Sequence, residues 1–174
     1  MTAINHHIPD ALLASYAAGS LPQPFALIVA THVSMCLDCR ASLDAHQSAG
    51  GIVLEDTAGI DLSGDLKART LAMLDAPFTD TPARTRSGIY PAPVMEALKG
   101  KSPRWKSLGM GVRQCILSAG KEGSTRLLYI PSNRAVPDHS HNGLELTLVL
   151  QGSFSDETGH FGVGDVEVAD QSLE

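Results

Sequence analysis

A compact group of metal-binding side chains lies in the first quarter of the sequence. His32, Cys36 and Cys39 form an H-x-x-x-C-x-x-C pattern, which places one imidazole and two thiols within eight residues. These groups are ligands that Zn²⁺ prefers, and a structural zinc site needs four of them in a tetrahedron. If the segment is one helix, the spacings i, i+4 and i+7 place all three on the same face. The pattern predicts three ligands of a zinc site, with a fourth supplied from elsewhere.

Two other interpretations of these cysteines have to be weighed. A redox dithiol usually opens a helix after a strand, and we expect no strand before Cys36. The pair could also be ordinary core residues of a small helical domain. The histidine four residues before Cys36 favours the metal. Cys115, the third cysteine, falls in an expected strand and is predicted to be a buried hydrophobic residue rather than a redox sensor.

A second group of candidate ligands lies in the C-terminal half. His139, His141 and Glu145 share the same parity, so in a strand without a bulge their side chains point to one face. Two imidazoles and a carboxylate that face a barrel interior suit zinc, iron, manganese or nickel. The alternative is a pair of surface histidines in a turn. The alternating leucines that follow Glu145 indicate a well-buried strand, which favours the metal site.

Composition and charge narrow the function classes. The 174 residues are 43% hydrophobic but only 5% aromatic, so the cores should be aliphatic, and a small helical domain of this kind gains from a metal cross-link. The net charge of −6 and the absence of a basic recognition helix argue against direct DNA binding. The first ten residues lack a cationic start, and the longest apolar run, 25–30, is too short for a bilayer. We therefore expect a cytoplasmic protein without membrane contact, in which thiols stay reduced.

The apolar periodicity predicts helices first and strands afterwards. Helices are expected from Pro9 to Gly19, from Phe25 through the metal motif to Leu43 with a break at Gly50-Gly51, over 65–74, and over 94–98. Strands are expected over 112–117, 125–130, 144–150 and 163–168. Proline, threonine, arginine and serine dominate 77–93, as in a linker. The prediction is an α+β chain with a zinc-stapled helical bundle over 1–85, a linker over 86–104 and a β domain over 105–174.

The spacing of the second ligand group resembles a known motif. His139-x-His141-x-x-x-Glu145, followed by Gly152, resembles the first motif of the cupins, and Gly164 resembles the start of their second motif. Cupins are small antiparallel β-barrels that hold a metal inside. The resemblance implies a cupin-like β-barrel with a second zinc or another divalent ion on these three side chains. The fourth ligand of the motif would fall one residue past the end of the chain, so we expect the barrel to be truncated.

The two halves together resemble the ChrR family of zinc-binding anti-sigma factors, over nearly the whole chain. The resemblance implies that the helical half binds an extracytoplasmic-function (ECF) sigma factor in a 1:1 complex and inhibits it. It implies that the cupin-like half takes part in releasing the sigma factor in response to singlet oxygen or related oxidants. The stretches that carry the resemblance are His6-His7, Ala11-Leu12-Leu13, Tyr16-Ala17-Ala18-Gly19, Pro137-Asp138-His139 and Leu150-Gln151-Gly152.

The same resemblance assigns four zinc ligands, which would be His7, His32, Cys36 and Cys39. His7 lies three residues before Asp10, as the family's histidine does. His46, seven residues after Cys39, is the rival by spacing, and His6 is the immediate neighbour. We prefer His7, because a ligand before the first helix joins two helices, whereas His46 would tie one helix to itself.

An enzymatic function is the main alternative. Many cupins are metal-dependent dioxygenases or isomerases with this ligand set, and the helical half would then be an appendage. The low aromatic content leaves little to line a substrate pocket, and Glu157, His160 and Asp165 are candidate acids or bases only because they are polar. We therefore expect no catalytic residues, and a regulator rather than an enzyme.

Overall fold

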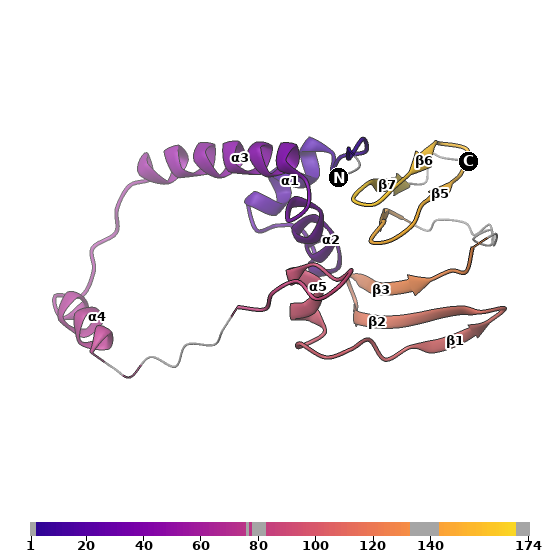
Figure 1. Ribbon diagram of the computed structural model, residues 1–174. Coiled ribbons are helices and arrows are strands. Elements are labelled where there is room, and N and C mark those ends of the chain that lie inside the picture. The colour runs from indigo at the N-terminus through magenta and orange to yellow at the C-terminus, as the bar shows by residue number, and fades with distance from the viewer. Residues whose placement is uncertain (1–2, 76, 78–82, 133–142, 170–174) are drawn as a thin grey trace.

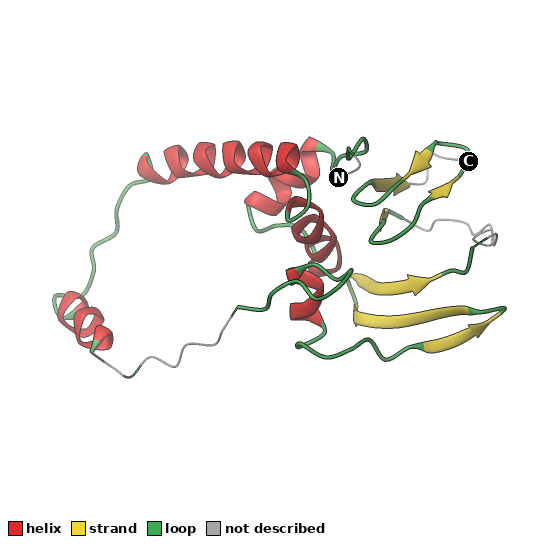
Figure 2. Ribbon diagram, viewed as in Figure 1, coloured by secondary structure: helices red, strands yellow, loops and turns green. Residues whose placement is uncertain are grey.

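The computed structural model describes residues 3–75, 77, 83–132 and 143–169. Within these residues helices come first and strands follow (Figure 2), which confirms the predicted α+β class. The helices are α1 (Asp10–Ala17), α2 (Gln23–Val33), α3 (Leu37–Glu55), α4 (Leu66–Leu74) and α5 (Ala92–Ala97). The strands are β1 (Lys106–Gly109), β2 (Val112–Gly120), β3 (Gly123–Tyr129), β4 (Glu145–Leu148), β5 (Phe154–Ser155), β6 (His160–Phe161) and β7 (Val166–Ala169).

Proline and glycine set the limits of the first two helices. Pro9 and Pro22 each precede a helix with φ at −54°. Pro24 lies in the first turn of α2, where its missing N–H removes no helical hydrogen bond. Gly19 follows α1 with φ at +69°, a left-handed conformation that glycine adopts without steric cost. The first helix therefore ends where the sequence predicted.

The metal motif lies on two helices, so the prediction of one continuous helix is wrong. The chain bends by 120° between α2, which ends at Val33, and α3, which begins at Leu37. The N–H of Cys36 donates to the carbonyl of His32 at 2.8 Å, and the Arg40 side chain donates to two carbonyls at the end of α2. These bonds satisfy carbonyls that a helix end leaves without partners. In the described residues only this bent pair, and no single helix, combines the length and hydropathy of a membrane span.

Helix α3 also runs further than predicted. Gly50-Gly51 was expected to end it, but the helix continues to Glu55 because both glycines are exposed, where each costs about 1 kcal/mol relative to alanine without blocking the helix. The residues of α3 beyond His46 are all exposed, and α4 has no buried residue. Figure 1 shows α4 well separated from the other elements. We refer to residues 47–74 as the arm, whose large apolar side chains are exposed except for the partly buried Leu66.

Helix α2 is shared by both halves of the chain. It contacts α1 and α3, and it also contacts α5, β3 and β4. The hydroxyl of Thr125 in β3 donates to the carbonyl of Pro24 at 2.9 Å, which ties the start of α2 to the sheet. The core around this helix accordingly draws on both halves. Its buried members are Ile8, Leu13, Val29, Cys36, Cys39 and Val166.

The β half consists of antiparallel strands, as predicted. β1, β2 and β3 form one sheet, β4 pairs with β7, and β5 pairs with β6. In the β4–β7 pair, Glu145 lies opposite Ala169 and Leu148 opposite Val166. The described residues form three separate sheets and no closed barrel, whereas the sequence predicted a truncated cupin-like barrel.

A second, smaller core lies under the three-stranded sheet. Val94 from α5 packs with Cys115 from β2 and Leu127 from β3, all three of them buried. Cys115 is therefore a buried hydrophobic residue, as predicted. α5 lies within the predicted linker of residues 86–104, and the domain boundaries themselves stay a prediction.

Replacing Leu13 with alanine tests the shared core. Leu13 is 2% exposed, so Leu13→Ala should lower the free energy of unfolding by about 2–5 kcal/mol through lost burial and the cavity it leaves. Ile52→Ala is the control, because Ile52 is 64% exposed on the arm and should change stability by less than about 0.5 kcal/mol. Urea unfolding followed by circular dichroism measures both. Equal effects of the two variants would contradict the packing described here.

Candidate metal centre

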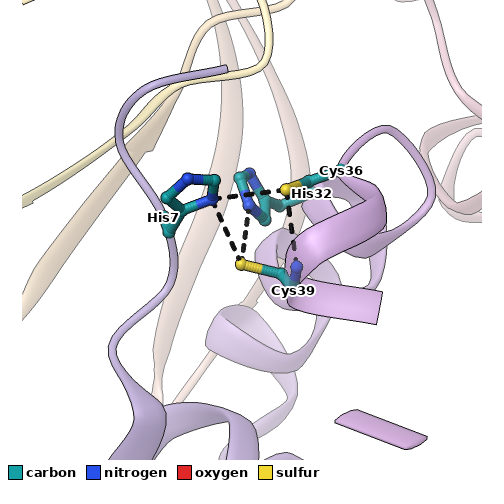
Figure 3. Close-up of side chains that lie close together, drawn as sticks. All are labelled: His7, His32, Cys36 and Cys39. Atoms are coloured by element: carbon teal, nitrogen blue, oxygen red, sulfur yellow. Dashed lines mark hydrogen bonds between the residues drawn. The ribbon is translucent and has the colours of Figure 1, made fainter. Parts of the chain in front are cut away.

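Four nitrogen- and sulfur-bearing side chains meet where the first three helices join (Figure 3). His7 comes from the segment before α1, His32 from the last turn of α2, Cys36 from the N-cap of α3 and Cys39 from its first turn. Each offers one ligand atom, and these atoms all lie within 4.8 Å of one another. The group could therefore hold a metal ion, and its members belong to three different segments of the chain.

The spacing of the four groups fits a small tetrahedral ion. Nδ1 of His7 lies 3.3 Å from Sγ of Cys36 and 3.6 Å from Sγ of Cys39, and Nε2 of His32 lies 3.2 Å from Sγ of Cys39. Typical zinc–sulfur and zinc–nitrogen bonds imply a nitrogen–sulfur edge of about 3.6 Å in a tetrahedron. These three nitrogen–sulfur distances lie within about 0.4 Å of that value, and all four ligand atoms lie within 4.8 Å of one another.

Burial gives the site the electrostatics of a closed metal centre. His32 has no exposed surface, and both cysteines are 3% exposed. Burial lowers the pKa of His32, which favours the neutral imidazole that binds metals. Burial raises the pKa of the Cys39 thiol to about 11, so this thiol must lose its proton when it binds a cation. His7 is the one exposed member, and it closes the site on the solvent side.

A hydrogen bond from the β half fixes the orientation of His32. Nδ1 of His32 lies 2.8 Å from the carbonyl oxygen of Gly164. A carbonyl can only accept, so the proton is on Nδ1 and the lone pair of Nε2 faces Cys39. Partners of this kind, behind the ligands, orient metal-binding histidines and raise their basicity.

Comparison with known proteins identifies the family to which the chain belongs. A family described as the ChrR cupin-like domain matches residues 95–172. The anti-sigma-E factor ChrR of Cereibacter sphaeroides is 51% identical over 174 residues, which cover 98% of this chain and 82% of that protein. The chain belongs to the ChrR family. A crystal structure of Rhodobacter sphaeroides SigE in complex with the anti-sigma ChrR matches with a TM-score of 0.86 and 49% identity, over 99% of this chain and 90% of that one.

The two rival histidines lie outside the four-residue group. Nε2 of His46 lies 2.8 Å from Oδ1 of Asp10, a contact that ties α3 to the start of α1. The ring of His6 packs against Phe161 of β6, with ring centroids 4.3 Å apart. In this ChrR family member the structure therefore brings His7, and neither rival, up to His32 and the cysteines. Their role as ligands stays a prediction.

The second predicted metal site falls only partly within the described residues. His139 and His141 lie outside them, and Glu145 is the exposed first residue of β4. Glu167 of β7 shares a hydrogen bond with Asp156, and burial together with this bond raises the pKa of Glu167 to about 7. The same bond lowers the pKa of Asp156 to about 2. The metal site on His139, His141 and Glu145 stays a prediction.

Sequence reasoning missed the part that Asp165 takes in the site. Its carboxylate accepts hydrogen bonds from the backbone N–H groups of Asn5 and His6, directly before His7. Burial opposes ionisation of Asp165, but the N–H donors of His6, Gly162 and Asn5 outweigh it and lower the pKa of the carboxyl group. A Gly-Asp pair before an apolar strand indicates a turn, but nothing in the sequence pairs that turn with the N-terminus.

Loss of one cysteine tests the metal centre. We expect Cys39→Ser to hold about one zinc per chain less than the unaltered protein, because a hydroxyl is a poor substitute for a thiolate. Cys115→Ser is the matched control, since Cys115 is also buried but lies in β2, away from the cluster. Elemental analysis measures the metal.

The same measurement separates the three histidines. His7→Ala should lose the metal, whereas His6→Ala and His46→Ala should keep it. Retention of zinc by His7→Ala together with its loss from His46→Ala would overturn the choice of His7.

Replacing Glu167 tests the carboxyl pair. With a pKa of about 7 in the folded chain and an ordinary value of 4.5, Glu167 takes up a proton on folding between these pH values. Its contribution to stability is therefore full below pH 4.5 and is lost as the pH rises through 7. Glu167→Gln should remove this loss. The Tm of the variant relative to wild type should therefore rise between pH 4 and pH 8. Exposed Glu157→Gln is the control, and equal pH profiles for all three proteins would contradict the pairing.

Proposed function

We propose that this chain is an anti-sigma factor that binds an ECF-type sigma factor in a 1:1 complex and inhibits it. The observation that carries the proposal is the likeness, over 99% of the chain, to a ChrR molecule crystallised in complex with SigE. The curated relative is likewise named an anti-sigma factor. These names support a regulator over the alternative of a metal-dependent cupin enzyme.

The arm supplies a surface that a partner protein could cover. Large apolar side chains are 52–84% exposed along its length. A nine-residue helix such as α4 is not stable by its own propensity, and helices of this kind gain stability when an apolar face is buried. Exposed apolar surface on this scale marks protein–protein interaction sites. Its members are Ile52, Val53, Leu54, Ile60, Leu62, Leu71, Met73 and Leu74.

A structural zinc would hold the helices that carry this arm. His7, His32, Cys36 and Cys39 would bind it, and a closed set of two thiolates and two imidazoles favours zinc in a structural rather than a catalytic role. When bound, zinc would cross-link the N-terminal segment, α2 and α3 without redox chemistry. The direction in which α3 leaves the helical half, and with it the arm, would follow from this cross-link.

The β half would take part in regulation. We propose that residues 1–85 form the anti-sigma domain, 86–104 the linker and 105–174 the cupin-like domain. The cupin-like domain would act in releasing the sigma factor in response to singlet oxygen or related oxidants, and a second divalent ion would bind His139, His141 and Glu145. The protein would act in the cytoplasm, where sigma factors and RNA polymerase are found, without touching DNA itself.

Paired substitutions test the arm as the sigma-binding surface. Leu71→Asp with Leu74→Asp should weaken binding at least 100-fold, about 2.7 kcal/mol, because it places charge in an apolar interface. The matched control is Leu108→Asp with Met110→Asp, since these side chains are 51% and 73% exposed on the β1–β2 hairpin, against 52% and 77% for the arm pair. Calorimetry with the ECF sigma factor of the same organism measures both. No binding by the unaltered chain would refute the proposed function, and equal losses in the two variants would refute the arm as the surface.

A further inference from the structure

The turn between β6 and β7 lies directly against the candidate metal centre. This turn comprises residues 162–165, and we refer to it as the docking turn. The carbonyl of Gly164 accepts the hydrogen bond from Nδ1 of His32. The N–H of Val166 donates to the carbonyl of His6 at 3.2 Å. Backbone groups of the cupin-like half thus bond to the His32 side chain and to the backbone of His6, the residue before His7.

Asp165 ties the same turn to the segment that carries His7. One carboxylate oxygen, Oδ1, accepts from the N–H of Asn5 at 2.7 Å and from the N–H of His6 at 2.9 Å. The other, Oδ2, accepts from the N–H of Gly162 at 2.8 Å and lies 3.5 Å from Nδ1 of His6. The side chain is 4% exposed, so these bonds form in a dry environment. Asp165 therefore fixes the backbone immediately before the exposed ligand.

Gly164 allows the docking turn to pack closely against the helical half. Gly164 has φ at +95°, and a Cβ added there would lie 2.6 Å from Cδ1 of Ile4 and 3.8 Å from Cε of Met35. Glycine is the residue that allows both this backbone conformation and this approach. The docking turn thus contacts the N-terminal segment on one side and the α2–α3 bend on the other.

We propose that the docking turn is the outer shell of the metal centre, with Gly164 and Asp165 as positioning residues for His32 and His7. This inference rests on the proposed zinc site and concerns how zinc binding at that site is regulated. Metal binding and docking of the cupin-like half onto α2 become one coupled equilibrium. A change in the β half that withdraws the turn weakens the hold on the metal, and loss of the metal loosens the turn by the same free energy.

The physical reason is that the turn acts on ligand orientation rather than on ligand identity. Without the Gly164 carbonyl, His32 loses the bond that keeps Nε2 directed at the cysteines. Without the Asp165 carboxylate, the N-terminal segment regains the conformational freedom that metal binding must then remove. Loss of one outer-shell partner typically lowers metal affinity by about 10–100-fold.

A matched pair of glycine substitutions tests the contact. Gly164→Ala should release zinc to a chromogenic chelator about 10–100 times faster than wild type. Gly109→Ala is the control, because Gly109 has nearly the same φ, +98°, but nothing within 4 Å of an added Cβ. The backbone strain is therefore similar in both, and only the first variant disturbs the docking turn.

A matched pair of aspartates tests the carboxylate. Asp165→Ala should weaken zinc binding about 10–100-fold, and Asp165→Asn, which keeps one acceptor oxygen, should fall between it and wild type. Asp156→Ala is the control, since Asp156 also accepts backbone N–H groups, but only from Thr158 and Gly159 in its own turn. The absorption spectrum of the Co²⁺-loaded variants should keep the bands of a tetrahedral site with two thiolates, which shows that the ligands themselves are intact.

The outcomes separate this inference from the function on which it rests. Absence of zinc or of sigma binding in the unaltered chain would refute the proposed function. Zinc and sigma binding by the unaltered chain, with wild-type zinc release in Gly164→Ala and Asp165→Ala, would refute the coupling alone.

Hydrogen exchange of the unaltered chain covers the case in which a variant fails to fold. Removal of zinc should speed exchange at the amides of His6 and Val166 and leave the β2–β3 amide of Leu127 unchanged. Equal rates at His6 and Val166 with and without zinc would overturn the coupling.

Discussion

The helical half is arranged around one cluster of side chains. Two buried thiols and a buried imidazole meet a second imidazole from the segment before α1. Burying such groups costs free energy unless each finds a partner, and here the partners are one another and the backbone around them. The 120° bend between α2 and α3 brings His32 at the end of one helix to the cysteines at the start of the next. A cation bound by the four groups would place a positive charge among these thiols and imidazoles.

Helix α2 makes this local arrangement a property of the whole chain. Its buried face belongs to the same apolar core as Leu13 of α1 and Val166 of β7. The hydrogen bond of His32 to Gly164 runs from that helix to the β half. Metal centre and cupin-like half therefore share one set of packing contacts. A structural change in the β strands could reach the metal centre directly, because the docking turn contacts His32 and also His6, the residue before His7.

The arm stands in contrast to this tightly packed junction. Its large apolar residues are mostly exposed while those of α1 and α2 are buried or partly buried, so the molecule separates a packed centre from an uncovered surface. This division suits a protein that holds a partner under one condition and gives it up under another. The centre sets where the arm begins, and the arm provides the area on which a sigma factor could bury its own apolar side chains.

The sequence by itself determined the types and spacing of the candidate ligands, the order of helices and strands, and the resemblance to the ChrR family. These follow from local chemistry, because the preference of zinc for thiolate and imidazole and the periodicity of apolar residues are readable along the chain. Tertiary structure alone decided that the motif bends between two helices, that His7 rather than His46 approaches the cysteines, and that Gly164 and Asp165 bond to His32 and to the backbone before His7. Those contacts join residues as many as 160 positions apart, and no local pattern encodes which distant backbone group will meet a given side chain.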